Sequence, residues 1–112
     1  MPLQQEAIIE ISDMEHLDRL IEQNKDTVLI LDFFATWCGP CKEIAPVYKE
    51  LAEKYRNIKF LKIDINEAED VCTKYDVKLM PTFVFLKNAE QIDILEGGYP
   101  DVLREMVAKH AN

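Results

Sequence analysis

The sequence DFFATWCGPCK runs from Asp32 to Lys42 and contains two cysteines separated by a glycine and a proline. It overlaps an almost continuously apolar stretch, Thr27–Phe34, which is typical of a buried strand. A helix is expected to follow from about Gly39 to Tyr55. This succession places Cys38 and Cys41 at the carboxyl end of a central strand, where open α/β sheets carry their active sites.

The rest of the chain predicts strands that alternate with helices. Further strands are expected at Glu6–Ile11, Ile58–Asp64, Thr82–Lys87 and Gln91–Glu96, and further helices at the capping box Ser12–Glu15, at Asn66 and at Pro100. The predicted order is therefore β-α-β-α-β-α-β-β-α. Such an order indicates an α/β fold, with a central mixed five-stranded sheet flanked by four helices on its two faces.

Composition narrows the class of protein. A chain of 112 residues with 48% hydrophobic and 30% charged residues is expected to form one globular domain, residues 1–112. The formal net charge of −8 disfavours nucleic acid as a partner, because phosphates carry the same sign. Apolar runs such as Val28–Leu31 are far shorter than a membrane span, and no signal or transit pattern is visible. A cytoplasmic protein is therefore expected, one that does not act at a membrane.

The spacing of the two cysteines suits a disulfide that opens and closes. If Cys38 caps the following helix, Gly39 and Pro40 occupy its first turn and the amide of Cys41 points at the Cys38 sulfur. The positive end of the helix favours a thiolate at Cys38. Gly39 allows a partner's backbone to approach, and Pro40 restrains the loop so that both sulfurs remain within bridging distance.

Asp32 is an acid inside an otherwise apolar strand. Burial would raise its pKa and allow it to exchange a proton near neutral pH. Its position six residues before Cys38 suggests that it helps Cys41 to lose a proton, directly or through a water molecule. The alternative is a core acid that is simply satisfied by hydrogen bonds.

Two segments together carry a resemblance to a known family. Asp32–Lys42 and Met80–Phe83 resemble the active-site motifs of the thioredoxins, and the likeness extends over nearly the whole chain. The sequence is most similar to the cytosolic thioredoxins of animals. The resemblance implies a single thioredoxin domain with Cys38 as the attacking thiolate and Cys41 as the resolving cysteine.

The resemblance also implies a docking groove beside the cysteines. Pro81 would follow a cis peptide bond and lie against the pair, a geometry that is uncommon outside proline. Met80 would offer backbone groups to a substrate strand, with Trp37 and Gly97 completing the apolar groove.

The implied activity is that of a general protein-disulfide reductase. A reversible dithiol–disulfide couple at Cys38 and Cys41 would reduce disulfides in substrate proteins such as peroxiredoxins, donate electrons to thiol-dependent enzymes and maintain the redox balance of the cell. A thioredoxin reductase that uses FAD and NADPH would regenerate the dithiol. The chain itself, a monomer, would bind neither a cofactor nor a metal.

Three departures from the family pattern lead to expectations of their own. Phe34 stands where many bacterial members have tryptophan, which leaves Trp37 as the only indole. Phe60 stands where some bacterial members have a lysine, which argues against a partnership between Asp32 and a lysine. Asn88-Ala89 replaces the frequent Asn-Gly turn, and since alanine tolerates positive φ poorly, a longer turn or another type is expected.

Three rival functions remain to be distinguished. Zinc binding would need two further ligands, and the available Cys72, His16 and His110 lack the usual spacing. Cys72 is expected to be a passive thiol, His16 an exposed residue and His110 a helix C-terminal charge. A binding module that ignores its thiols would keep its partners after Cys38→Ser, whereas a reductase would lose activity. An oxidising or isomerising relative usually has histidine where Pro40 stands.

Overall fold

The computed structural model describes residues 7–112, so the predicted start of the first strand at Glu6 lies outside the described part. The elements are β1 (Ile8–Glu10), α1 (Met14–Gln23), β2 (Val28–Phe34), α2 (Gly39–Lys54), β3 (Lys59–Asp64), α3 (Glu69–Lys74), β4 (Thr82–Lys87), β5 (Glu90–Glu96) and α4 (Pro100–His110). Their order confirms the predicted one, and the architecture is the thioredoxin fold. Within residues 7–112, no helix combines the length and the apolar character needed to cross a membrane.

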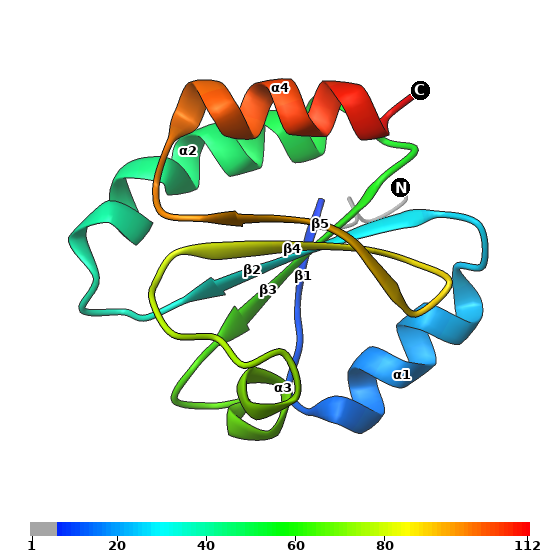
Figure 1. Cartoon of the computed structure of the whole chain (residues 1–112), viewed down its shortest axis with the longest axis horizontal. Coiled ribbons are helices and arrows are strands. Elements are labelled where there is room, and N and C mark those ends of the chain that lie inside the picture. The colour runs from blue at the N-terminus through cyan, green and yellow to red at the C-terminus, as the bar shows by residue number, and fades with distance from the viewer. Residues whose placement is uncertain (1–6) are drawn as a thin grey trace, which may run out of the picture.

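The sheet is mixed, in the spatial order β1-β3-β2-β4-β5 (Figure 1). The strands β1, β3 and β2 pair in parallel, whereas β4 is antiparallel to both β2 and β5. Strand β2 therefore lies at the centre, and all of its residues except Phe34 are buried. A strand covered on both faces needs apolar side chains in both directions, which explains its nearly continuous apolar sequence.

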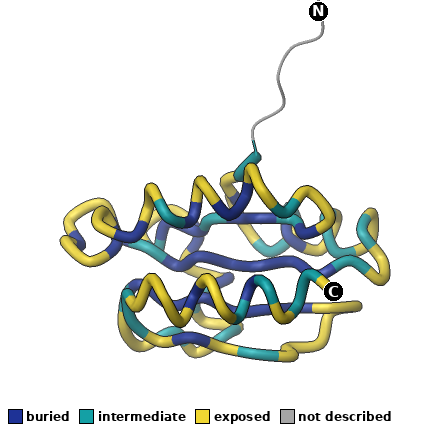
Figure 2. Tube along the Cα trace, turned by 90° about the horizontal axis from the view of Figure 1, so that it is seen from above, coloured by how far each residue is buried: buried dark blue, intermediate teal, exposed yellow. Residues whose placement is uncertain are grey.

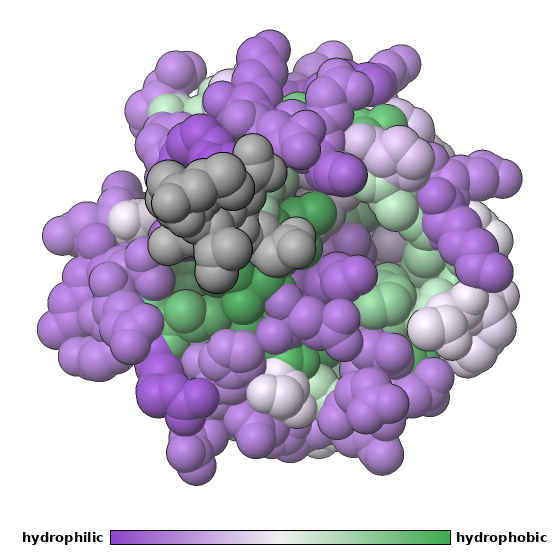
Figure 3. All heavy atoms as spheres, turned by 180° about the vertical axis from the view of Figure 1, so that it is seen from behind, coloured by the Kyte–Doolittle hydropathy of each residue, from purple (hydrophilic) through white to green (hydrophobic). Residues whose placement is uncertain are grey.

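Helices cover both faces of the sheet. Figure 1 shows α2 and α4 on one face and α1 and α3 on the other. The buried residues concentrate in the strands between these two layers, while the helices turn exposed residues outward (Figure 2). The face seen in Figure 3 is mostly hydrophilic, and apolar surface appears there only between polar side chains. Each helical layer thus buries one apolar stripe against the sheet.

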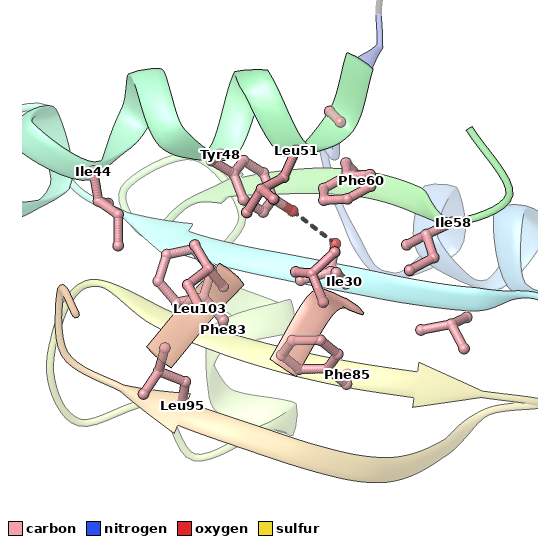
Figure 4. Packing of buried hydrophobic residues seen from close by; sticks show 13 residues of the cluster. Ile30, Ile44, Tyr48, Leu51, Ile58, Phe60, Phe83, Phe85, Leu95 and Leu103 are labelled. Carbon is pink, nitrogen blue, oxygen red and sulfur yellow. Dashed lines mark hydrogen bonds between the residues drawn. The ribbon is translucent and has the colours of Figure 1, made fainter. Parts of the chain in front are cut away.

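Tyr48 anchors the helix that carries the cysteines (Figure 4). Its hydroxyl, in the core between α2 and the sheet, lies 2.7 Å from the Leu61 carbonyl oxygen and 3.1 Å from that of Ile30. Its ring packs against Phe60 and Phe83, with centroids 5.3 and 5.5 Å away. Burial raises the pKa of Tyr48 well above its usual value, so the hydroxyl remains a donor. The tyrosine therefore links α2 to both β2 and β3.

The predicted capping box of the first helix is wrong by one residue. Asp13, not Ser12, is the N-cap of α1, and its carboxylate accepts a hydrogen bond of 2.8 Å from the His16 amide. The Ser12 amide in turn donates to Nδ1 of His16 at 3.2 Å. Both serine and aspartate are good caps, so their sequence alone does not fix where the helix begins.

The predicted cap of the third helix is also wrong. The N-cap of α3 is Ala68, which makes no side-chain capping bond. Asn66 belongs to the preceding turn, where its amide donates to the Asp64 carboxylate at 2.9 Å. The backbone amides of Glu67 and Ala68 also bond to the Asp64 carbonyl oxygen. The end of β3 thus organises this turn, rather than the asparagine side chain.

The turn between β4 and β5 corrects a third expectation. Asn88 and Ala89 form a tight two-residue connection, and their φ angles are 51° and 70°. Two positive φ values are characteristic of the turn that matches the twist of a hairpin. Asn88 is held there by Asp26, because its side chain donates to that carboxylate at 2.9 Å and accepts from the Asp26 amide at 2.8 Å. These bonds offset the unfavourable conformation of Ala89.

Candidate active site

The two cysteines of the motif are joined by a disulfide at the start of α2. Cys38 is the N-cap, with Gly39 and Pro40 in the first turn and Cys41 as the third helical residue. The Cys41 amide donates to Cys38 Sγ at 3.2 Å, and the two Cα atoms lie 5.3 Å apart. The Cys38 sulfur therefore receives the hydrogen bond that a negative charge at this position would need.

The loop before β4 lies against the disulfide. The Met80–Pro81 peptide bond is cis, and the Met80 carbonyl oxygen is 3.7 Å from Cys38 Sγ. Met80 also packs against the small apolar cluster formed by Ala35 and the two cysteines. The backbone of this loop thus borders the Cys38 sulfur.

Gly97 and Gly98 bring the loop between β5 and α4 close to the disulfide and Pro81. The Gly97 amide donates to the Pro81 carbonyl oxygen at 2.8 Å, and Gly97 has a φ of 110°, which favours glycine. Sequence reasoning missed Gly98, where a Cβ would lie 3.5 Å from Pro40 and 3.6 Å from Pro81. A pair of adjacent glycines before a helix was the available signal. Figure 1 shows these loops converging with the end of β2 on one side of the molecule.

Trp37 lies beside the disulfide and is 67% exposed. An indole with that much of its surface in water is unusual, since tryptophan is highly buried on average. Leu79, next to Met80, is also exposed. Apolar surface therefore accompanies the redox pair, as a site that docks other proteins requires.

Asp32 lies in β2, behind the disulfide, and is only 7% exposed. Its Oδ1 atom has no hydrogen-bond partner among residues 7–112. Burial raises its pKa from 3.8 to about 7, and the positive charge of Lys62 offsets part of that rise. Asp32 is therefore not a core acid whose two oxygens are both satisfied by hydrogen bonds within the described residues.

A cleft of about 400 Å³ connects these groups, and both Asp32 and Cys41 line it. Lys42, Tyr48 and Lys62 also contribute to its wall. The cleft is large enough to hold water, and among its mostly apolar lining Asp32, Thr36 and Lys62 offer water polar partners. The cleft thus connects Cys41 to the buried carboxyl group.

The expectation that no lysine acts on Asp32 is wrong, because the positive charge of Lys62 lowers the pKa of that carboxyl group. Lys62 is directly opposite Asp32 in the β2–β3 pairing. Its Nζ atom lies 5.0 Å from the ring centroid of Phe34 and 4.0 Å from a carboxylate oxygen of Glu10. Phe60 and Lys62 are two residues apart on one strand and so share a face. The lysine was missed because its position was judged from the family pattern and not from strand register.

The potential zinc ligands named in the sequence lie elsewhere. Cys72 is half-buried in α3, and burial, together with the charges of Asp64 and Asp70, raises the pKa of its thiol, as expected of a passive cysteine. His110 Nε2 lies 2.8 Å from Asp93 Oδ2 in the last turn of α4. In the part of the chain from residue 7 onward, no group of three metal-binding side chains comes together.

Comparison with known proteins agrees with this geometry. The thioredoxin family model matches residues 8–109. Thioredoxin-1 of Caenorhabditis elegans is 56% identical over 95 residues, which make up 85% of this chain and 83% of that protein. The X-ray structure of Fasciola hepatica thioredoxin superposes with a TM-score of 0.89 at 38% identity and covers 91% of this chain and 98% of its own.

A second similar structure concerns the thiol-resolving mechanism of a yeast mitochondrial 1-Cys peroxiredoxin via the glutathione and thioredoxin systems. It aligns with a TM-score of 0.83 at 32% identity and covers 91% of this chain and 94% of its own. The chain therefore belongs to the thioredoxin family and is a thiol–disulfide oxidoreductase that reduces protein disulfides.

Proposed function

We propose that Cys38 is the nucleophile and Cys41 the resolving cysteine of this reductase. The Cys38 thiolate attacks one sulfur of a substrate disulfide, forms a mixed disulfide and releases the other substrate sulfur as a thiolate. Cys41 then attacks Cys38 Sγ, which frees the second substrate sulfur and leaves the Cys38–Cys41 disulfide. The hydrogen bond of 3.2 Å from the Cys41 amide to Cys38 Sγ carries this assignment, because it stabilises a thiolate at Cys38 and at no other cysteine.

Asp32 accepts the proton that Cys41 loses before it attacks. A carboxyl group with a pKa of about 7 exchanges protons efficiently near neutral pH. The cleft that Asp32 and Cys41 both line supports transfer through water. In this proposal Lys62 is a positioning residue, because it acts on the carboxyl group and not on the sulfurs.

The substrate docks as an extended segment across the exposed surface around Cys38. Trp37 supplies apolar contact area, and the backbone of Met80 supplies hydrogen-bonding groups next to the cis Pro81. Gly97 borders the groove, while Gly39 leaves room for the partner's backbone, with nothing within 4 Å of a Cβ built there. Pro40 completes the wall, since Gly98 packs against it.

A partner enzyme returns the disulfide to the dithiol. Thioredoxins need no bound cofactor, so we assign the FAD and NADPH to a thioredoxin reductase and not to this chain. Substrates include peroxiredoxins, a proposal supported by the similar structure from yeast mitochondria. The protein acts in the cytoplasm as a monomer with a single domain over residues 1–112. It has neither nucleic acid nor membrane partners. The net charge of −8 supports the exclusion of nucleic acid.

Trapping the mixed disulfide tests the assignment of roles. Cys41→Ser is expected to accumulate a covalent complex with a peroxiredoxin or an oxidised peptide, whereas Cys38→Ser forms none and reduces nothing. A complex that forms equally through Cys41 would overturn the assignment. If Cys38→Ser kept its partners and its effect on them, the chain would be a binding module.

The reduction potential tests the direction of the reaction. Equilibration in defined thiol buffers, followed through Trp37 fluorescence, is expected to give a value below about −250 mV, the range known for thioredoxins. A value above about −200 mV would place the chain with isomerases and oxidases.

A further inference from the structure

Tyr99 is a large exposed aromatic residue beside the active site that the proposed mechanism does not use. It is the N-cap of α4 and 59% exposed. Its ring lies over Gly97, so that a Cβ built on that glycine would be 2.5 Å from Cε2 of the tyrosine. The glycine backbone thus supports one side of the ring, while much of the remaining ring surface is open to solvent.

A short series of contacts connects Tyr99 to the redox pair. The Gly97 amide bonds to the Pro81 carbonyl oxygen at 2.8 Å. A Cβ built on Gly98, the residue before Tyr99, would lie 3.5 Å from Pro40 and 3.6 Å from Pro81. A substrate segment whose disulfide reaches Cys38 must cross this loop or end beside it. The ring is therefore continuous with the surface that the reductase activity requires.

An acidic residue lies close to the tyrosine in the sequence on each side. Glu96 ends β5 and is exposed, and the Asp101 side chain, in the first turn of α4, is 95% exposed. Asp101 pairs with Arg104 at 3.3 Å, but solvent screens an exposed pair of this kind and leaves the carboxylate able to exchange partners. The face of an aromatic ring is itself electronegative. A cation is the ligand that suits an exposed tyrosine with an exposed acidic residue on either side in the sequence.

We propose that Tyr99, Glu96 and Asp101 form a subsite that selects substrates with an arginine or lysine side chain near the disulfide under attack. The guanidinium or ammonium group lies over the Tyr99 ring, and the carboxylates of Glu96 and Asp101 attract it. The net charge of −8 favours the approach of such basic segments. This inference rests on the proposed docking of substrates at Cys38 and adds a preference for their charge.

Oxidised peptides with one disulfide test the subsite. The peptides are identical except for Arg, Leu or Glu, placed in turn on either side of the attacked cysteine. The second-order rate constant of the reduced protein with each peptide is measured by stopped-flow Trp37 fluorescence at low salt. The expected result is that Arg reacts faster than Leu and Leu faster than Glu on one side.

Variants assign that preference to the tyrosine. Tyr99→Ala is expected to lower the Arg/Leu rate ratio about three- to fivefold, as loss of an exposed cation–π contact would, while Tyr99→Phe retains the ratio. Asp101→Asn is expected to lower the ratio less and to weaken its dependence on salt. Ile94→Ala, a change at another exposed side chain, on β5, serves as the matched control and leaves the ratio unaltered.

Three results would overturn the proposal. The Arg/Leu ratio could be the same in Tyr99→Ala and the unaltered protein, or Tyr99→Ala could slow all peptides equally, which would make the ring a support for the glycine loop. A Tyr99-dependent preference for Leu over Arg would show an apolar subsite instead. Failure of the underlying proposal looks different, because Cys38→Ser would then still react with the peptides.

Discussion

At the scale of single residues, Asp32 combines an energetically unfavourable position with a proposed role in proton transfer. The carboxyl group lies in the central strand, and its pKa is raised to about 7 because burial penalises its charge. Folded protein therefore holds a proton there between pH of about 4 and 7 that unfolded protein releases. The free energy of unfolding must therefore fall as the pH rises across this interval, by on the order of 4 kcal/mol from this group. Above the interval it should level off.

Asp32→Asn is expected to remove this pH dependence. At about pH 8 the variant should unfold with a free energy on the order of 3 kcal/mol higher, because the buried amide costs less than the buried charge. At about pH 4.5 the gain should vanish. Urea unfolding at the two pH values measures both differences.

The same variant separates stability from function. Resolution of a mixed disulfide by Cys41 should become slower, and its inflection near pH 7 should disappear. If Asp32→Asn resolved the complex at the unaltered rate and pH profile, Asp32 would be a core acid without a role in proton transfer.

Lys62 should tune the proton affinity of Asp32. Its positive charge lowers the pKa of that carboxyl group, so Lys62→Met should move the inflection to higher pH. Lys59→Met is the matched control, because Lys59 lies on the same strand but is opposite Leu29 and points to the other face. NMR titration of the Asp32 carboxyl carbon measures the shift. Equal shifts in both variants would mean a general effect of charge.

The site residues differ in how readily a sequence reveals them. Asp32 was recognisable because an acid inside an apolar run breaks the pattern of a buried strand. Lys62 was not, because its proximity to Asp32 depends on the register between β2 and β3. Gly98 was missed for a similar reason, since its contacts with Pro40 and Pro81 join three loops distant in sequence. Local patterns therefore predict individual residues, but not the pairs that tertiary structure creates.

At the scale of elements, the β4–β5 turn shows how a neighbouring loop overrides local preference. Asn88 and Ala89 both adopt positive φ, although alanine disfavours it. The two hydrogen bonds between Asn88 and Asp26 fix the turn from a loop that is 62 residues earlier in the chain. Sequence reasoning considered only the alanine and therefore expected another turn. The helix starts at Asp13 and Ala68 were misplaced similarly, by judging caps one side chain at a time.

Ala89→Gly is expected to stabilise the protein. Glycine adopts a φ of 70° without the steric cost that alanine bears, which should raise the free energy of unfolding by about 1 kcal/mol. Asn88→Ala should act in the opposite direction by a similar amount, because it removes both bonds to Asp26. Urea unfolding at neutral pH compares the two. A loss of stability in Ala89→Gly would show that the turn does not strain the alanine.

At the scale of the whole molecule, the architecture could be predicted from the sequence because the patterns of the individual elements and their order along the chain indicate the same fold. Strands and helices alternate clearly, and the central strand is apolar on both faces, which leaves few ways to arrange the layers. The spatial order of the strands, with β3 between β1 and β2, depends on long-range pairing that no local pattern encodes. Local sequence patterns do not predict long-range polar contacts between elements either.

The contact between His110 and Asp93 is one such link, and it ties the end of α4 to the edge strand β5. His110 Nε2 lies 2.8 Å from Asp93 Oδ2, and the imidazole packs on the Phe85 ring at 5.2 Å. Partial burial alone would raise the pKa of Asp93, but the bonds from His110 and from the Ile94 amide outweigh it and lower that pKa. The stabilisation is therefore present above the unfolded pKa of the carboxyl group and is lost as pH falls through the lower, folded value.

Asp93→Asn should therefore lower the free energy of unfolding at pH 7 by about 1 kcal/mol, and by less under acidic conditions where the carboxylate is neutralised. Glu90→Gln, on the same strand but exposed, controls for the loss of one negative charge. A double-mutant cycle with His110→Gln isolates the pair. Additive effects in that cycle would mean that the His110–Asp93 pair contributes nothing to joining α4 to β5, and that apolar packing, which includes Leu103, Val107 and the Phe85 contact, holds the helix to the sheet.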